Sequence, residues 1–167
     1  MRFDRRPATA RRRISLLAVA GITITALGAA AGCGRSDREQ ALDQATEQVR
    51  QRAALTEESI SGTLASPRAP SDQALLDAVA GVAEGGERHA IVFERQVESV
   101  DRIRLDLAFD ARSETGGMAR ATVVVRLCVR LTGTRGPDPG VTMTDIACGR
   151  IPENPLGKPD EIVGLAG

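Results

Sequence analysis

The sequence RIRLDLAFD, at residues 102–110, alternates apolar and charged side chains at every position except Ala108. A period of two is typical of a β-strand that turns one face to a core and the other face outward. The apolar set is Ile103, Leu105, Leu107 and Phe109, and the charged set is Arg102, Arg104, Asp106 and Asp110. A second run at 121–131, ATVVVRLCVRL, continues the pattern with its odd-numbered residues apolar. These two stretches predict the centre of an antiparallel sheet.

Two weaker alternating runs flank this pair, at 91–97 and at 141–148. In the first of them, Phe93 shares the parity of the apolar set. Turn-forming residues fill Ser113–Gly117 and Gly133–Gly140, as hairpins between antiparallel strands require. The sequence therefore predicts a roughly four-stranded antiparallel meander.

A helix is predicted before the sheet, because Ser36-Asp37-Arg38-Glu39 has the form of a capping box and good helix formers follow as far as Ser61. Gly62 is expected to stop this helix. Its apolar stripe is thin and built largely from small residues: Leu42, Ala45, Val49, Ala53, Ile60 and Leu64. Because the rest of its surface is polar, we expect a loosely docked helix or a stalk.

A shorter second helix is predicted after Ser66–Pro70, a stretch whose prolines break the first helix. Ser71 takes the N-cap position, and Gly85-Gly86 ends the helix. Its apolar residues lie on one side: Leu75, Leu76, Val79 and Val82. We expect this helix to cover the apolar face of the sheet, which makes the fold class α+β.

The first third of the chain contains a different pattern, RRRISLLAVAGITITALGAAAGC at residues 11–33. Six arginines precede or open this stretch and are opposed only by Asp4, and such a positive segment stays on the cytoplasmic side of a membrane. The run from Ile14 to Ala31 contains no ionisable residue. A charged start, an apolar run and a small-residue end are typical of a signal peptide.

The end of this segment, Ala30-Ala31-Gly32-Cys33, resembles the lipobox of bacterial lipoproteins. The resemblance implies that the Cys33 thiol carries a diacylglyceryl group and that residues 1–32 are cleaved off as a signal peptide. Ala30 stands where a leucine is usual in that family, and the resemblance covers only the first 33 residues. The remainder of the chain resembles no family known to us.

Other interpretations of the segment remain open. The nineteen uncharged residues of Ile14–Gly32 are long enough for an uncleaved membrane anchor, and an ordinary signal peptide with an incidental cysteine is also compatible. Ala10-Arg11-Arg12-Arg13-Ile14 is similar to a twin-arginine export signal, although Ser15 replaces a second apolar residue. The general secretory route and the twin-arginine route both remain open.

The sequence contains three cysteines, and if Cys33 carries a lipid, two thiols remain. Cys128 and Cys148 then form an even pair in an oxidising compartment, and we predict a disulfide. A register with Val129 opposite Ala147, and a turn near Asp138, puts both thiols on one sheet face. Two thiols are too few for zinc, which takes four ligands, and the spacing is not that of a Cys-x-x-Cys redox site.

These patterns divide the chain into a signal peptide at 1–32, a lipid-anchored helix with a proline-containing linker at 33–70, a small α+β domain at 71–150, and an irregular tail at 151–167. Without residues 1–32 the chain has 16 basic and 21 acidic side chains, a net charge of −5 with histidine neutral. A domain of this charge is not expected to bind nucleic acid. Lys158 is the only lysine, and with the alanine and glycine content this suggests a GC-rich genome, as in actinobacteria.

Catalytic patterns are weak in this sequence. His89 is its only histidine, and nothing in the sequence places a nucleophile beside it. The acidic pairs Glu57-Glu58 and Asp160-Glu161 lie on polar stretches rather than in apolar pockets that would shift their pKa. We expect no cofactor and no metal site.

One set of residues on the outward face of the sheet is a candidate for ligand binding: Arg102, Arg104, Arg120, Arg126 and Arg130. These arginines could form a patch for an anionic partner such as a lipid headgroup or a cell-wall polymer. They could equally pair across strands with Asp106 and Asp110, with Asp110 opposite Arg120 as a natural register.

The sequence thus predicts an exported lipoprotein at the outer face of the cell membrane, with a non-catalytic binding or scaffolding domain. The alternative is a small cell-envelope hydrolase whose site combines the arginine face with loop residues. The expected partner is the membrane, through a lipid at Cys33. A protein or cell-wall partner stays open.

Overall fold

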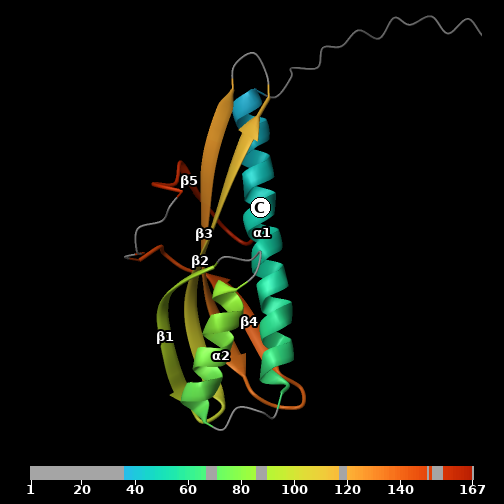
Figure 1. The fold of residues 1–167 in the computed structure, drawn as a ribbon, viewed down its shortest axis with the longest axis vertical. Coiled ribbons are helices and arrows are strands. Elements are labelled where there is room, and N and C mark those ends of the chain that lie inside the picture. The colour runs from blue at the N-terminus through green and yellow to red at the C-terminus, as the bar shows by residue number, and fades with distance from the viewer. Residues whose placement is uncertain are drawn as a thin grey trace, which may run out of the picture. The chain divides into compact units, whose positions relative to one another are not determined.

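The residues that the structure describes fold into two helices and five strands, in an order that confirms the predicted α+β class and the antiparallel meander (Figure 1). The elements are α1 (Asp37–Leu64), α2 (Asp72–Glu84), β1 (Ile91–Ser99), β2 (Arg102–Thr115), β3 (Ala121–Thr134), β4 (Gly140–Asp145) and β5 (Glu161–Val163). Strands β1 to β4 pair in sequence order, and β5 pairs with β3 in parallel.

The structure, a computed structural model, describes residues 36–66, 71–85, 90–116, 120–149, 151 and 156–166. The predicted signal peptide, the predicted lipidation site Cys33 and the histidine at position 89 lie outside the described residues.

The capping box predicted at the start of α1 is present. The Oγ of Ser36 accepts a hydrogen bond from the backbone N–H of Glu39 at 3.2 Å, and a carboxylate oxygen of Glu39 accepts one from the N–H of Ser36 at 2.7 Å. The helix does not stop at Gly62 but continues to Leu64. Because Leu64 is fully buried, its packing outweighs the weak helix propensity of a single glycine.

Helix α1 is not a stalk, and this prediction was wrong. It lies along the sheet over β2 and β3, and one face is buried along its whole length: Ala41, Ala45, Val49, Ala53, Thr56, Ile60 and Leu64. Small side chains let a helix come close to a sheet, so an alanine stripe can be a tightly packed interface. Gly133 on β3 serves the same purpose, since an added Cβ would lie 2.6 Å from a methyl group of Leu64.

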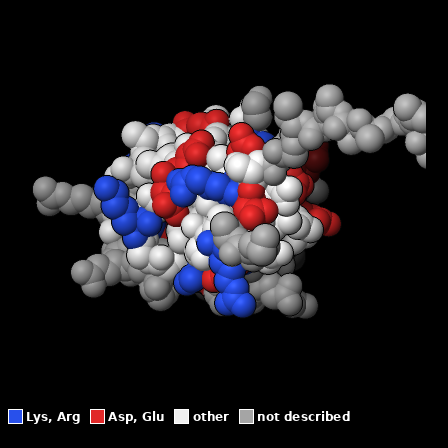
Figure 2. Space-filling model, turned by 90° about the horizontal axis from the view of Figure 1, so that it is seen from above, with Lys and Arg blue, Asp and Glu red and all other residues white. Residues whose placement is uncertain are grey.

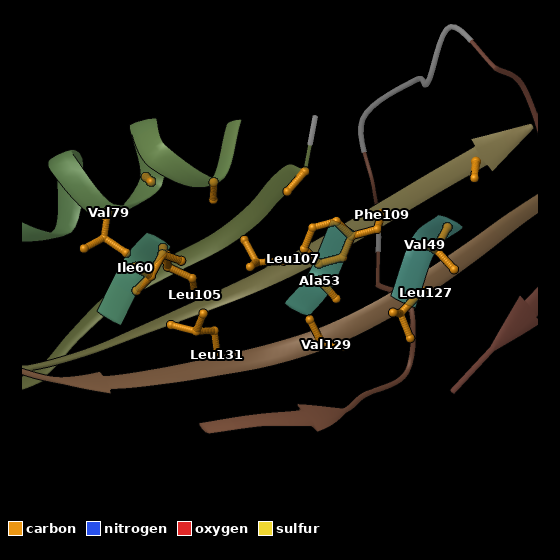
Figure 3. Close-up of a cluster of buried hydrophobic side chains, with 14 of the residues drawn as sticks. Val49, Ala53, Ile60, Val79, Leu105, Leu107, Phe109, Leu127, Val129 and Leu131 are labelled. Atoms are coloured by element: carbon orange, nitrogen blue, oxygen red, sulfur yellow. The ribbon is translucent and has the colours of Figure 1, made fainter. Parts of the chain in front are cut away.

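Helix α2 begins as predicted, with Ser71 as N-cap accepting a hydrogen bond from the N–H of Ala74 at 3.2 Å. It packs mainly on β1, beside α1, so two helices rather than one cover the apolar face of the sheet (Figure 1). Between the helices and the strands lies one core with Phe109 near its centre (Figure 3). The leucines around it come from β2 and β3: Leu105, Leu107, Leu127 and Leu131.

The hairpin of β2 and β3 is longer than predicted. Thr115 pairs with Ala121, so Arg120 precedes the strand and does not lie opposite Asp110. The strands extend because α1 offers partners to their polar residues: the hydroxyl of Ser113 donates to Gln44 at 2.8 Å, and that of Thr115 donates to the carbonyl of Asp37 at 3.1 Å.

Strand β1 departs from simple alternation at two irregularities, between Val92 and Glu94 and between Val97 and Ser99. The first one reverses the expected parity, so Val92 packs against the core in place of Phe93. The ring of Phe93 instead lies near Gly149, where an added Cβ would be 3.5 Å away.

The predicted disulfide between Cys128 and Cys148 is present, with a Cα–Cα distance of 5.4 Å. The register differs by two residues from the predicted one, since Val129 lies opposite Asp145 and not Ala147. A shift of two keeps every side chain on its face, which is why the pairing of the cysteines was still correct. Cys148 therefore lies beyond the end of β4 rather than within it.

The tail at 151–167 was predicted to be irregular, and this prediction was wrong in part, because the segment contains β5. Strand β4 ends opposite Val129, and the next stretch of the β3 edge, 125–127, pairs with β5. Three further contacts hold this segment. The carboxylate of Asp160 accepts a hydrogen bond from the N–H of Val124 at 2.8 Å, and that of Asp145 accepts one from the N–H of Leu165 at 2.8 Å. The side chain of Arg50 donates to the carbonyl of Gly164 at 3.0 Å. The prolines that suggested an irregular tail all precede β5 in the sequence.

Candidate functional site

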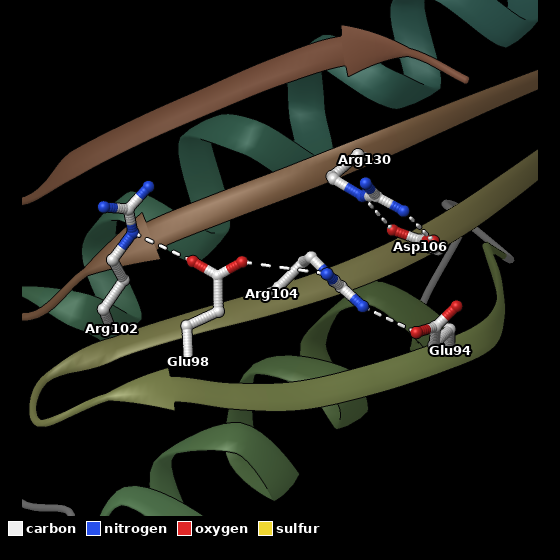
Figure 4. A network of polar contacts seen from close by, with 6 residues as sticks. All are labelled: Glu94, Glu98, Arg102, Arg104, Asp106 and Arg130. Carbon is white, nitrogen blue, oxygen red and sulfur yellow. Dashed lines mark hydrogen bonds and ion pairs between the residues drawn. The ribbon is translucent and has the colours of Figure 1, made fainter.

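The outward face of the sheet carries a cluster of charged residues that we call the charged face. It consists of Glu94 and Glu98 from β1, Arg102, Arg104, Asp106 and Asp110 from β2, and Arg126 and Arg130 from β3. Figure 4 shows most of these side chains pointing toward one another across the strands. Four of the five arginines that the sequence analysis selected belong to it.

Two of the ion pairs are bidentate, and the carboxylates of both lie almost wholly out of solvent. The guanidinium of Arg126 donates to both carboxylate oxygens of Asp110, at 2.6 and 2.7 Å, and that of Arg130 donates to both oxygens of Asp106, at 2.8 and 2.7 Å. The aspartate side chains are only 4% and 3% exposed. A carboxylate with so little exposure needs a charged partner, because desolvation alone would strongly disfavour it.

These pairs also hold their arginines in the charged form. The hydrogen bonds that Arg126 donates to Asp110 are the main cause that raises the pKa of Arg126, and those that Arg130 donates to Asp106 raise the pKa of Arg130 in the same way. An arginine so placed is a fixed cation and has no proton to offer near neutral pH. The two pairs are therefore suited to structure and recognition, and not to proton transfer.

The remaining members form a chain of contacts between β1 and β2 (Figure 4). Arg104 binds Glu94 at 2.6 Å and approaches Glu98 at 3.9 Å, and Glu98 binds Arg102 at 3.0 Å. The Nε of Arg104 is buried and has no hydrogen-bond partner among the described residues. The glutamates were missed by the sequence analysis. Their spacing of four, which keeps two residues on one side of a strand, was the available signal.

The charged face is balanced, with four arginines and four carboxylates. Its arginines pair across strands with acidic neighbours, which is the second of the two interpretations of the arginine set. The partner of Asp110 is Arg126 rather than Arg120, because the hairpin is longer than expected. Arg120 is exposed and lies outside the charged face.

The disulfide lies between the two bidentate pairs. Cys128 stands on β3 midway between Arg126 and Arg130, opposite Ala108, and it is 2% exposed. The N–H of Ile146 donates to the carbonyl of Cys128 at 3.1 Å. The bridge thus ties the segment after β4 to the middle of the charged face.

A second feature is a hollow of about 440 Å³ beside β1, lined by Glu84, Val92, Phe93, Glu94 and Arg95. Glu94 is already engaged by Arg104, and Arg95 lies 3.4 Å from Asp77. Within the described residues, no group of three or more His, Cys, Asp or Glu side chains is arranged to hold a metal ion. None of the described helices is both long and apolar enough to cross a membrane.

The chain was compared with protein-family models, with curated proteins and with solved structures, and none of the three comparisons found a match.

Proposed function

We propose that this chain is an exported lipoprotein, held at the outer face of the cell membrane by a lipid on Cys33, and that its folded part is a non-catalytic binding or scaffolding domain. The observation that carries the proposal is the pattern of residues 11–33, in which an arginine-rich start, an apolar run and small residues lead directly to a cysteine.

The fold offers two points of support. A disulfide is expected in an oxidising compartment, and the Cys128–Cys148 bridge joins parts of the same sheet face. The described fold also begins at Ser36, so removal of residues 1–32 and a lipid at position 33 would leave every described element in place.

The charged face supports binding rather than catalysis. A hydrolase that used this face would need its arginines to bind an anionic substrate. All four arginines of the charged face are instead engaged by carboxylates, with the closest contacts at 2.6 Å. Paired side chains of this kind give a fixed pattern of charge, which can contribute to the specificity of an interface.

The test is the intact mass of the protein after extraction in detergent, measured before and after reduction. We expect the mass of the chain from Cys33 plus a diacylglyceryl group, with a gain of two hydrogen atoms on reduction. A Cys33→Ala variant is the matched control and should carry no lipid. An unprocessed mass without lipid would mean an uncleaved anchor, and a processed mass without lipid would mean plain secretion, and either result would overturn the proposal.

A further inference from the structure

Helix α1 is fixed to the sheet from its first turn to its last. Its buried face begins at Ala41 and ends at Leu64, and its N-cap is Ser36. Only Gly34 and Arg35 separate this cap from Cys33 in the sequence. Three residue steps span about 10 Å when fully extended, so any lipid on Cys33 would be held close to the start of the helix.

The surface around the start of α1, which we call the proximal end, includes the adjoining ends of β2 and β3, at Thr115 and Ala121. The contact of Thr115 with the carbonyl of Asp37 joins the two at 3.1 Å. Arginines and acidic residues are mixed here: Arg38, Arg112, Arg120 and Glu114 are exposed, and Asp37 is half-buried. Figure 2 looks down on this end and shows basic side chains directly beside acidic ones. Such a surface is neither strongly attracted to an anionic membrane nor strongly repelled by it.

The opposite surface, which we call the distal end, is formed where three connections meet. The N–H of Gly136 donates to the carbonyl of Leu64 at 3.4 Å, and the N–H of Arg135 donates to that of Asp101 at 2.8 Å. Arg135 also lies 4.0 Å from Asp72 at the start of α2. Val100, beside this junction, is 79% exposed, the highest value among the large apolar residues described.

The length of α1 sets the separation of the two ends. Its 28 residues span about 42 Å at the usual helical rise. The exposed side of α1 carries carboxylates such as Glu47 and Glu58, and the chain from Cys33 onward has a net charge of −5. An anionic lipid surface would therefore repel the molecule if it lay along this side.

We propose that the proximal end is the surface that meets the lipid headgroups, and that the distal end with Val100 points away from the membrane. This inference rests on the proposed lipidation of Cys33. It assigns the lipid surface as the partner of the proximal end. The charged face and the distal end then stay accessible to other molecules of the cell envelope.

The chain contains no tryptophan, so one introduced tryptophan is a unique optical probe. The matched variants are Gly116→Trp at the proximal end and Val100→Trp at the distal end. An added Cβ at Gly116 meets nothing within 4 Å, and Val100 is exposed, so both should fold. A second pair, Glu114→Trp and Asp138→Trp, uses exposed residues of the same two ends.

The lipidated variants would be reconstituted into vesicles of phosphatidylcholine and phosphatidylglycerol that contain a headgroup-labelled dansyl lipid. We expect energy transfer to the dansyl group to be several-fold stronger for the proximal tryptophan than for the distal one, in both pairs. Equal transfer would mean that the molecule lies flat, and stronger transfer from the distal site would mean the reverse orientation. Both results overturn the orientation while leaving the lipid anchor intact. Failure of the proteins to stay with the vesicles would instead overturn the anchor, and the orientation with it.

Discussion

The two faces of β2 are built from alternate residues of one stretch, 103–110, and both are buried. On the helix-covered face, Leu105, Leu107 and Phe109 are fully buried among apolar neighbours. On the charged face, Asp106 and Asp110 are almost as inaccessible, but each is held there by an arginine of β3. The same strand therefore combines two different ways of removing side chains from water.

The physical consequences of the two faces differ. Burial of apolar surface is favourable without regard to direction, so the helix-covered face should supply most of the stability. A buried ion pair gains attraction but loses hydration, so its net contribution is small, although loss of one partner is costly. We therefore expect the helix-covered face to determine whether the chain folds, and the charged face to reinforce the register of the strands.

The largest effect is expected from Phe109→Ala. Phe109 is completely buried at the centre of the core, and loss of its ring leaves a cavity that should lower the free energy of unfolding by about 4 kcal/mol. Urea titration followed by circular dichroism would measure this change, since the chain has no tryptophan or tyrosine to report unfolding. The control Val100→Ala, at a site 79% exposed, should change the stability by less than about 0.5 kcal/mol. Equal effects at the two sites would contradict the assigned core.

Loss of the disulfide is expected to have the next largest effect. The double variant Cys128→Ser/Cys148→Ser opens a loop with a sequence separation of 20, which the chain-entropy model values at about 3 kcal/mol. The stability of the double variant would be compared with that of the oxidised and the reduced parent. The reduced parent and the double variant should have the same free energy of unfolding. If the oxidised parent had that same value too, the bridge would add nothing to the stability that the other contacts give the segment after β4.

The substitution Ala45→Leu tests whether α1 is tightly docked. Ala45 is completely buried against the sheet, so a larger side chain must push the helix outward at an expected cost of about 2 kcal/mol. The matched control is Ala54→Leu on the exposed side of the same helix, where the same change should have little effect. A stalk-like helix would tolerate both substitutions equally, and that outcome would restore the interpretation that the structure overturned.

The contrast between the two faces also explains which features the sequence could predict. The alternation at 102–110, the capping box at Ser36 and the pairing of Cys128 with Cys148 all follow from local spacing or parity, and all were correct. Local signals of this kind are unaffected by a two-residue change in register.

The wrong predictions depended on contacts between distant parts of the chain. The alanines on α1 suggested weak packing when the helix was considered alone. In the fold they pack in one core with Phe109 and the leucines of the sheet. The length of the β2–β3 hairpin depended on Gln44 of α1, which accepts from Ser113, and β5 depended on the edge that β4 leaves at 125–127. Glu94 and Glu98 have the parity of the charged set, but their pairing with Arg104 and Arg102 depended on how β1 lies against β2.

The smallest effect is expected on the charged face. Arg126→Met leaves Asp110 buried without its partner, and we expect a loss of about 1.5 kcal/mol, less than for a fully enclosed pair because Arg126 is 12% exposed. The double variant Asp110→Leu/Arg126→Met removes both charges and should recover most of that loss. Arg130→Met should be milder than Arg126→Met, because the Arg130 side chain is 39% exposed and water can replace part of the pair.

The pH dependence of the Arg126→Met effect provides a further check. The pKa of Arg126 is raised above its ordinary, already high value, chiefly by its hydrogen bonds to Asp110. A group whose pKa is raised by folding stabilises the folded state fully at any pH below its pKa in the unfolded chain. This stabilisation is lost only as the pH rises through its pKa in the folded chain. The difference in unfolding free energy between parent and Arg126→Met should therefore stay constant from neutral to mildly alkaline pH. A difference that shrank over that range would mean that the group responsible is not this arginine.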